Sequence, residues 1–148
     1  MKTKIIIFLY VVFALISTAS FSQSKEKKQK NNDGVFIHLS SSYDNPHKML
    51  MALSIADKMS EDKKVILFID LEGVKIAVKG AQDVRIEPYN TMKNILERLF
   101  EKKVEIMVCP LCLKYAGYKP EDLKEGIKIA EKDRFFNFTN GRILTLNY

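Results

Sequence analysis

Residues 103–118 read KVEIMVCPLCLKYAGY and contain both cysteines of the 148-residue chain. The apolar run at 104–108 is rich in β-branched residues and predicts a short buried strand that ends at Cys109. Pro110 follows at once, and proline suits the first position of a helix, where its missing N–H would have no partner. The stretch therefore predicts that Cys109 lies where a strand ends and a helix begins.

A thiol at such a position has two features of a reactive group. Unpaired backbone N–H groups and the positive end of a helix dipole favour a thiolate. In an open α/β sheet, the carboxyl ends of the strands also form the edge at which ligands bind. We therefore expect Cys109 to lie at the functional site and the rest of the chain to serve as its scaffold.

Outward from this stretch, apolar runs alternate with helical patterns. Further strands are expected at residues 35–39, 64–69 and 142–146, with another candidate at 84–86. Helices are expected at residues 46–59, 74–79, 90–102 and 120–130. This alternation predicts one α/β domain with three layers, in which helices cover both faces of a mostly parallel sheet of four to five strands. Its topology should be similar to that of flavodoxin or Rossmann folds.

The N-terminal residues predict an exported protein. Residues 1–22 contain Lys2 and Lys4, then the apolar run 5–16 and several small residues, which is the order of a cleaved signal peptide. Residues 23–33 form a polar leader, so the folded domain should span residues 34–148. The apolar run is short for a membrane span, and we expect no stable membrane insertion after cleavage. An uncleaved anchor is the alternative to a periplasmic or secreted location.

Charge and motifs argue against several classes of partner. The formal net charge is +6, and removal of Lys2 and Lys4 leaves 22 basic and 18 acidic residues. This small excess, without a basic run interleaved with aromatic residues, does not predict nucleic-acid binding. The sequence contains no G-x-G-x-x-G motif or P-loop, so we expect no cofactor. One Cys-x-x-Cys pair with His38 and His47 lacks the spacing of a zinc site, so we expect no metal.

Four polar residues are candidates for shaping a substrate site around the cysteines. Ser41 and Asn45 belong to a hydroxyl-rich loop after the first strand, and His47 opens the helix that follows. Glu72 follows the strand at 64–69 together with Asp70. Each residue also has an ordinary structural explanation, such as helix capping for Asn45 or helix entry for Glu72. His38 interrupts a strand and is expected to be a packed, hydrogen-bonded residue.

From about residue 35 to the C-terminus, the chain resembles the DsrE/DsrF family of sulfur-relay proteins. The segments that carry the resemblance are HLSSSYDNPHK, MLMALSIADKM, LFIDLEGVKIAV, VEIMVCPLCLKYAGY, EDLKEGIKI and ILTLN, in this order. In members that transfer sulfur, a cysteine just after this strand carries a persulfide, and Cys109 matches it. The resemblance also implies homo-oligomers, as trimers or hexamers, and a sulfur donor or acceptor protein as partner.

This chain differs from relay members that work in the cytoplasm, because it begins with a signal sequence. The resemblance thus implies an exported sulfur-handling protein that carries sulfane sulfur on Cys109, with sulfurtransferase-like activity if it is an enzyme. Two alternatives stay open. The chain could be a thiol–disulfide oxidoreductase that uses Cys109 and Cys112. It could also be a non-catalytic oligomerising module in which a Cys109–Cys112 disulfide is structural, although so short a loop would add little stability.

Overall fold

Five parallel strands form one sheet, in the order β4-β3-β2-β1-β5, within residues 32–148, the part of the chain that the computed structural model describes. The strands are β1 (Gly34–Leu39), β2 (Lys64–Ile69), β3 (Glu105–Val108), β4 (Ile127–Ile129) and β5 (Ile143–Asn147). The helices are α2 (Pro46–Met59), α3 (Met92–Glu101), α4 (Pro110–Tyr115) and α5 (Arg134–Asn137), with 3₁₀ helices η1 (Leu71–Ile76) and η2 (Pro120–Asp122). The predicted α/β fold is confirmed, and every strand pairing is parallel.

The predicted signal peptide at residues 1–22 lies outside the described residues, as does nearly all of the leader at 23–33. Within residues 32–148, no helix is both long enough and apolar enough to cross a membrane.

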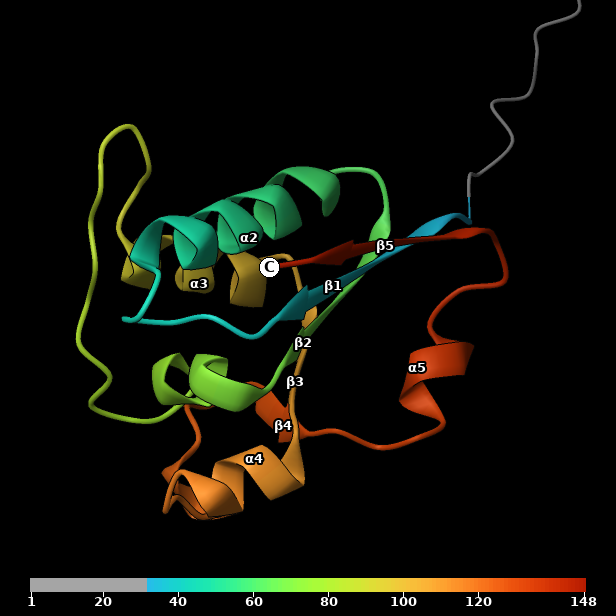
Figure 1. Ribbon diagram of the computed structural model, residues 1–148. Helices are drawn as coiled ribbons and strands as arrows, with labels where there is room; N and C mark the ends of the chain where they lie inside the picture. The colour runs from blue at the N-terminus through green and yellow to red at the C-terminus, as the bar shows by residue number, and fades with distance from the viewer. Residues whose placement is uncertain (1–31) are drawn as a thin grey trace, which may run out of the picture. The chain divides into compact units, whose positions relative to one another are not determined.

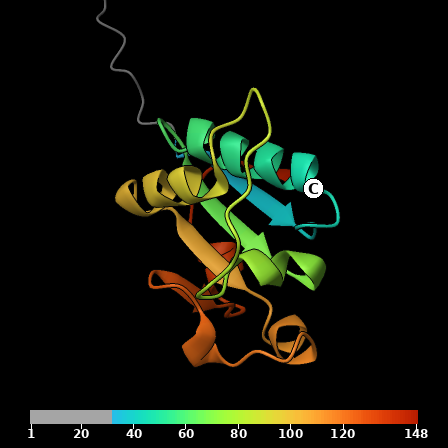
Figure 2. The same ribbon diagram turned by 90° about the vertical axis from the view of Figure 1, so that its left-hand side faces the viewer.

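The helices cover the two faces of the sheet unequally. From β1 to β4 the chain steps in one direction across the sheet, and right-handed connections then place α2 and α3 on the same face. The chain returns past the whole sheet between β4 and β5, and this connection places α5 on the opposite face (Figures 1 and 2). One face is thus covered by two long helices and the other by a helix of only four residues.

Alternation along the strands explains where the core lies. Ile37 of β1 and Leu67 of β2 are paired in register and buried beneath α2 and α3. Phe36 and Phe68 point to the opposite face, where Phe135 of α5 packs on both, with ring centroids 5.7 and 5.1 Å apart. Phe36 and Phe68 remain half-buried, so the second face of the sheet is only partly covered.

The predictions for residues 120–130 and 84–86 are wrong. Residues 120–130 do not form a helix; they form η2 and then β4, which pairs with β3 at the edge of the sheet. Gly126 has φ +89°, a left-handed conformation that interrupts a helix, and a Cβ there would lie 3.1 Å from the Phe100 ring. Residues 84–86 lie in a loop, so the fifth strand is β4 instead.

The starts of the two long helices follow from their capping residues. The side chain of Asn45 accepts a hydrogen bond from the Lys48 N–H at 3.1 Å, and Pro46 is the first residue of α2, as predicted. Thr91 caps α3 by accepting a hydrogen bond from the Asn94 N–H at 3.2 Å. Consequently α3 begins at Met92, two residues after the start that the sequence predicts.

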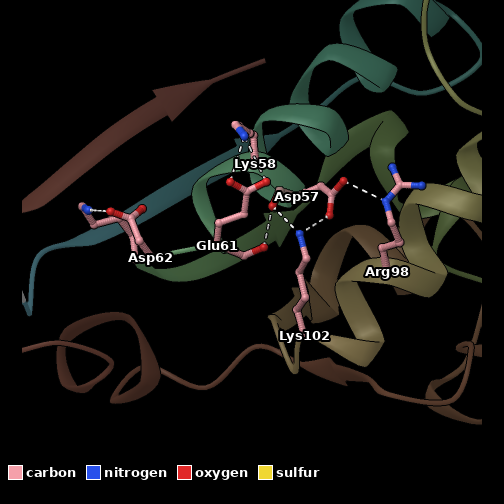
Figure 3. A network of polar contacts seen from close by, with 8 residues as sticks. Asp57, Lys58, Glu61, Asp62, Arg98 and Lys102 are labelled. Carbon is pink, nitrogen blue, oxygen red and sulfur yellow. Dashed lines mark hydrogen bonds and ion pairs between the residues drawn. The ribbon is translucent and has the colours of Figure 1, made fainter.

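A network of ion pairs joins α2 to α3 at Asp57 (Figure 3). The carboxylate accepts hydrogen bonds from Arg98 Nε at 2.9 Å and Lys102 Nζ at 2.7 Å, and only 16% of the Asp57 side chain is exposed. Burial alone would raise the pKa of Asp57, but the hydrogen bonds from Lys102 and Arg98 outweigh this effect, and the pKa is lowered. The carboxylate therefore stabilises the packing of the two helices when it is ionised.

Asp57→Asn should lower the free energy of unfolding by about 1–2 kcal/mol at neutral pH, because two cations lose their carboxylate. A lowered folded-state pKa means that this contribution is present above the unfolded-state pKa and is lost as the pH falls through the folded-state pKa. Urea unfolding should therefore show the variant and the wild type converging in strong acid. Asp62→Asn is the matched control, because its ion pair with Lys63 leaves the Asp62 side chain 71% exposed. An equal loss in both variants would contradict this account.

Candidate thiol site

The carboxyl ends of β1, β2 and β3 lie side by side and carry the candidate site. The N–H of Asp70, just after β2, donates to the carbonyl of Leu39 at the end of β1, at 3.1 Å. The N–H of Cys109, just after β3, donates to the carbonyl of Ile69 at the end of β2, at 2.9 Å. These backbone hydrogen bonds continue the sheet by one residue and hold Asp70 and Cys109 at neighbouring positions of its edge.

Cys109 lies where the sequence predicts, between the last residue of β3 and the first residue of α4, Pro110. Its backbone is extended, with φ −61° and ψ 119°, and its carbonyl accepts a hydrogen bond from the Leu113 N–H at 3.0 Å. The thiol is free and half-buried. Because α4 has only six residues, its dipole is small and adds little to the stabilisation of a thiolate at Cys109.

Cys112 lies one turn later in α4 and is in contact with Cys109. Its thiol interacts with the side chain of Cys109, and its sulfur accepts a hydrogen bond from the backbone N–H of Leu71. Burial raises the pKa of Cys112; the contact with Leu71 opposes this, while the contact with Cys109 and the charge of Asp70 add to the increase. Both cysteines are free thiols. The two thiols are therefore adjacent, and burial favours the protonated form of Cys112.

The raised pKa of Cys112 predicts slow alkylation. In Cys109→Ser protein, iodoacetamide should modify folded Cys112 more slowly than the same residue in the urea-unfolded chain, because burial reduces the thiolate fraction. The rate should rise with pH through a midpoint above the ordinary value of 9.0. Mass spectrometry of timed samples across a pH series measures both rates. A midpoint at or below that of the unfolded chain would be inconsistent with the buried environment.

An apolar pocket of about 560 Å³ opens beside Cys112, between η1 and α4. Its lining residues are Leu71, Glu72, Lys75, Leu111, Cys112, Tyr115 and Ala116. The helix predicted at residues 74–79 is instead the 3₁₀ helix η1, which begins three residues earlier and so brings Leu71 and Glu72 to the pocket. The sequence does not predict this pocket, because it depends on how two short helices from distant segments pack together.

Asp70 lies in contact with His38, and the sequence does not predict this contact. His38 Nε2 lies 2.8 Å from Asp70 Oδ1, and its Nδ1 lies 3.3 Å from Asn147 Oδ1 at the end of β5. The His38 ring also stacks on Phe68, at 5.6 Å between centroids. His38 is thus packed and hydrogen-bonded, as its place in a strand indicates, and it fixes the carboxylate whose charge acts on Cys112.

The four predicted binding residues lie in different surroundings. Ser41 is buried in the loop after β1, and the side chain of Asn45 is engaged in capping α2. His47 Nε2 lies 3.1 Å from the hydroxyl of Tyr89, in the loop before α3. Glu72 lines the pocket beside Cys112, where it forms an ion pair with Lys75. Of these four residues, the structure brings Glu72 alone to the pocket.

No three His, Cys, Asp or Glu side chains within residues 32–148 lie close enough together to hold a metal ion. The cysteines, the carboxylate of Asp70 and the pocket together form the candidate thiol site.

The fold and the thiol pair define a class: a small α/β protein with a free Cys-x-x-Cys pair at the carboxyl edge of a parallel sheet. A sequence model of the DsrE/DsrF-like family matches residues 33–145. The chain belongs to this family, and the resemblance seen in the sequence is confirmed.

Similar proteins agree with this assignment. The protein MJ0760 of Methanocaldococcus jannaschii is 27% identical over 108 residues, which cover 72% of this chain and 39% of that protein. The chain thus spans well under half the length of that relative. The crystal structure of the YchN protein from E. coli superposes with a TM-score of 0.61 at 21% identity, covering 77% of this chain and 99% of YchN. The MTH1491 protein of Methanobacterium thermoautotrophicum gives a TM-score of 0.56 at 14% identity, covering 77% and 98% of the two chains. At these identities the two structures show the fold alone.

Proposed function

We propose that this chain is an exported sulfur-handling protein that carries sulfane sulfur as a persulfide on Cys109. The family is associated with sulfur relay, and Cys109 occupies the position just after the third strand. One observation carries the proposal: Cys109 is a free thiol at the carboxyl edge of the sheet, beside Cys112, whose thiol has a pKa raised by burial. A thiol that stays protonated is a poor nucleophile, so this arrangement favours Cys109 over Cys112 as the attacking group.

The reaction is a thiol exchange with one additional sulfur atom. The thiolate of Cys109 attacks the outer sulfur of a donor R–S–SH, a bond forms between the two sulfur atoms, and the donor leaves as R–S⁻. The product is Cys109–S–SH, which an acceptor thiolate can attack in turn. The oxidation state of the sulfane sulfur is unchanged, so the step needs neither an oxidant nor a cofactor.

Cys112 supports a route for release. Its thiolate can attack the inner sulfur of the Cys109 persulfide, closing a disulfide and expelling hydrosulfide. This route needs the proton of Cys112 to be removed first, and its raised pKa makes that step unfavourable at neutral pH. The persulfide on Cys109 should therefore persist long enough to meet an acceptor.

Location and assembly belong to the same proposal. The sequence of residues 1–22 supports export to the periplasm or the exterior, and N-terminal sequencing of the mature protein tests this by locating the cleavage site.

The thinly covered face of the sheet, with Phe136 70% exposed, supports self-association as a trimer or hexamer. Sedimentation of the mature protein tests this, and a monomer at high concentration would exclude it. A sulfur donor or acceptor protein is the expected partner.

A second candidate is a thiol–disulfide oxidoreductase, favoured by the direct contact between Cys109 and Cys112. The two functions differ in what the protein holds after reaction. After incubation of reduced protein with polysulfide and removal of excess reagent, the sulfur-carrier proposal predicts close to one cyanide-reactive sulfur for each chain. Retention of no sulfur, together with a stable Cys109–Cys112 disulfide of measurable reduction potential, would support the oxidoreductase and overturn the proposal.

A further inference from the structure

The walls of the pocket beside Cys112 are unsuited to a small inorganic anion. Leu71, Leu111 and Tyr115 line it, and these side chains are 62, 76 and 94% exposed. Among the described lining residues the one cation, Lys75, is already paired with Glu72. Thiosulfate or polysulfide would thus meet mainly hydrocarbon surface here. Large apolar side chains gathered at one exposed place indicate a binding site for an apolar group.

Leu71 gives an independent indication. Its φ is +43°, in the left-handed region that residues with a Cβ avoid. In this conformation its N–H donates to the sulfur of Cys112, while its side chain lines the pocket and is largely exposed. Strained residues of this kind cluster at functional sites, where the conformation places a group that function needs. Here the strained residue joins the apolar wall to the thiol pair.

We propose that the pocket binds the apolar body of an organic persulfide, R–S–SH, in which R is a hydrocarbon or aromatic group, and that this compound is the sulfur donor to Cys109. The proposal rests on the function proposed above and names its substrate class. The volume of about 560 Å³ is within the range of small-molecule sites. Cys112 lines the pocket and its thiol interacts with that of Cys109, which is not itself a lining residue, so a donor held in the pocket lies beside the thiol pair.

The transfer step then takes place at Cys109. The Cys109 thiolate attacks the terminal sulfur of R–S–SH, the S–S bond to R breaks, and its electron pair leaves with R–S⁻. That thiolate takes a proton from water and R–SH departs, while Cys112 keeps its own proton. The products are Cys109–S–SH and R–SH, so one sulfane sulfur has moved with no net oxidation. Because the pKa of Cys112 is raised, Cys112 stays protonated and does not attack the new persulfide.

The first test measures binding without chemistry. Benzyl methyl sulfide carries an apolar body but no transferable sulfur, and calorimetric titration into the mature chain measures its affinity. Leu111→Ser should weaken binding about tenfold, because the pocket loses one of its apolar walls. Leu144→Ser is the matched control, since Leu144 is 51% exposed on β5, remote from the pocket, and should bind as the wild type does. Equal weakening in both variants, or no binding to the wild type, would overturn the proposal.

The second test separates this proposal from the function on which it rests. Rates of sulfur loading on Cys109 are compared for benzyl persulfide and inorganic polysulfide. The proposal predicts faster loading from benzyl persulfide, with the preference lost in Leu111→Ser and kept in Leu144→Ser. Loading from polysulfide alone would leave Cys109 a sulfur carrier but exclude the apolar donor. Binding of benzyl methyl sulfide without loading from either compound would support the pocket and overturn the sulfur-carrier function.

Leu71→Gly completes the test, because glycine adopts φ +43° without strain. This variant should be at least as stable as the wild type and yet bind benzyl methyl sulfide more weakly. A less stable variant with unchanged affinity would mean that Leu71 stabilises the fold and does not contribute to ligand binding.

Sedimentation of Leu111→Ser tests whether a second copy of this chain occupies the pocket instead. Loss of an assembly that the wild type forms would show that the pocket lies between copies of the chain, and would overturn the proposal.

Discussion

Cys109→Ser should abolish sulfur loading, with a decrease of at least about 100-fold, because a serine hydroxyl is not ionised near neutral pH and does not attack sulfane sulfur. Cys112→Ser should keep the first loading step, since Cys112, whose pKa is raised by burial, is not the attacking group. The sulfur should also stay longer on Cys109 in Cys112→Ser, because the route that closes a disulfide and expels hydrosulfide is removed. Cyanolysis of gel-filtered protein, sampled over time, measures both effects.

Two controls make this comparison secure. Serine differs from cysteine by one atom, and Cys109 is half-buried, so both variants should keep the circular dichroism spectrum and the unfolding midpoint of the wild type. The reverse pattern, in which Cys109→Ser loads normally and Cys112→Ser does not, would assign the nucleophile to Cys112. Normal loading of both variants would place the sulfur elsewhere.

Gly73→Ala should destabilise the fold by about 1–3 kcal/mol, because the turn after β2 has no room for a methyl group. A Cβ at Gly73 would lie 2.6 Å from the carbonyl oxygen of Leu39 and 2.9 Å from Cγ2 of Ile69. The nearest of these atoms belongs to the backbone of β1, which is fixed by its pairing with β2, so η1 itself has to move. Urea unfolding measures the loss. Movement of η1 also displaces Leu71 and should lower the affinity of the pocket for apolar ligands.

Gly80→Ala is the informative control, because it strains the backbone without a collision. Gly80 has φ +76°, and nothing lies within 4 Å of the position of its Cβ. Its replacement should cost about 1 kcal/mol from backbone conformation alone and leave the pocket unchanged. If Gly73→Ala lowers stability no more than a substitution at an exposed site, or leaves ligand binding unchanged, then the tight contact of η1 against β1 does not position the pocket.

The three central strands, β1, β2 and β3, were largely predictable because most of their residues are buried by neighbours on both sides. The run at 64–69 corresponds residue for residue to β2, and β1 extends the predicted strand by one residue, Gly34. β4 was not predictable in this way. Leu123, Ile127 and Ala130 have helical spacing, but the three residues of β4 gain their stability by pairing with β3, which no local pattern reveals. Gly126 was the signal that could have indicated the break.

The position of Cys109 followed from a local rule, since a strand, a cysteine and a proline in succession define a strand-to-helix junction. The rest of the site depends on contacts between distant segments. Asp70 meets His38 across neighbouring strands, and the pocket needs η1 to pack against α4. His47 was expected near the same edge of the sheet, but its contact is with Tyr89, in a loop that has no regular pattern.

The central claim is that Cys109 carries the sulfur, and peptide mapping by mass spectrometry tests it most directly. The mature protein is reduced, exposed to a sulfane-sulfur donor, alkylated to trap persulfides and digested so that Cys109 and Cys112 can be distinguished by fragmentation. The account predicts a gain of one sulfur atom located at Cys109. Added sulfur at Cys112, or a disulfide between the two cysteines with no added sulfur, would contradict it.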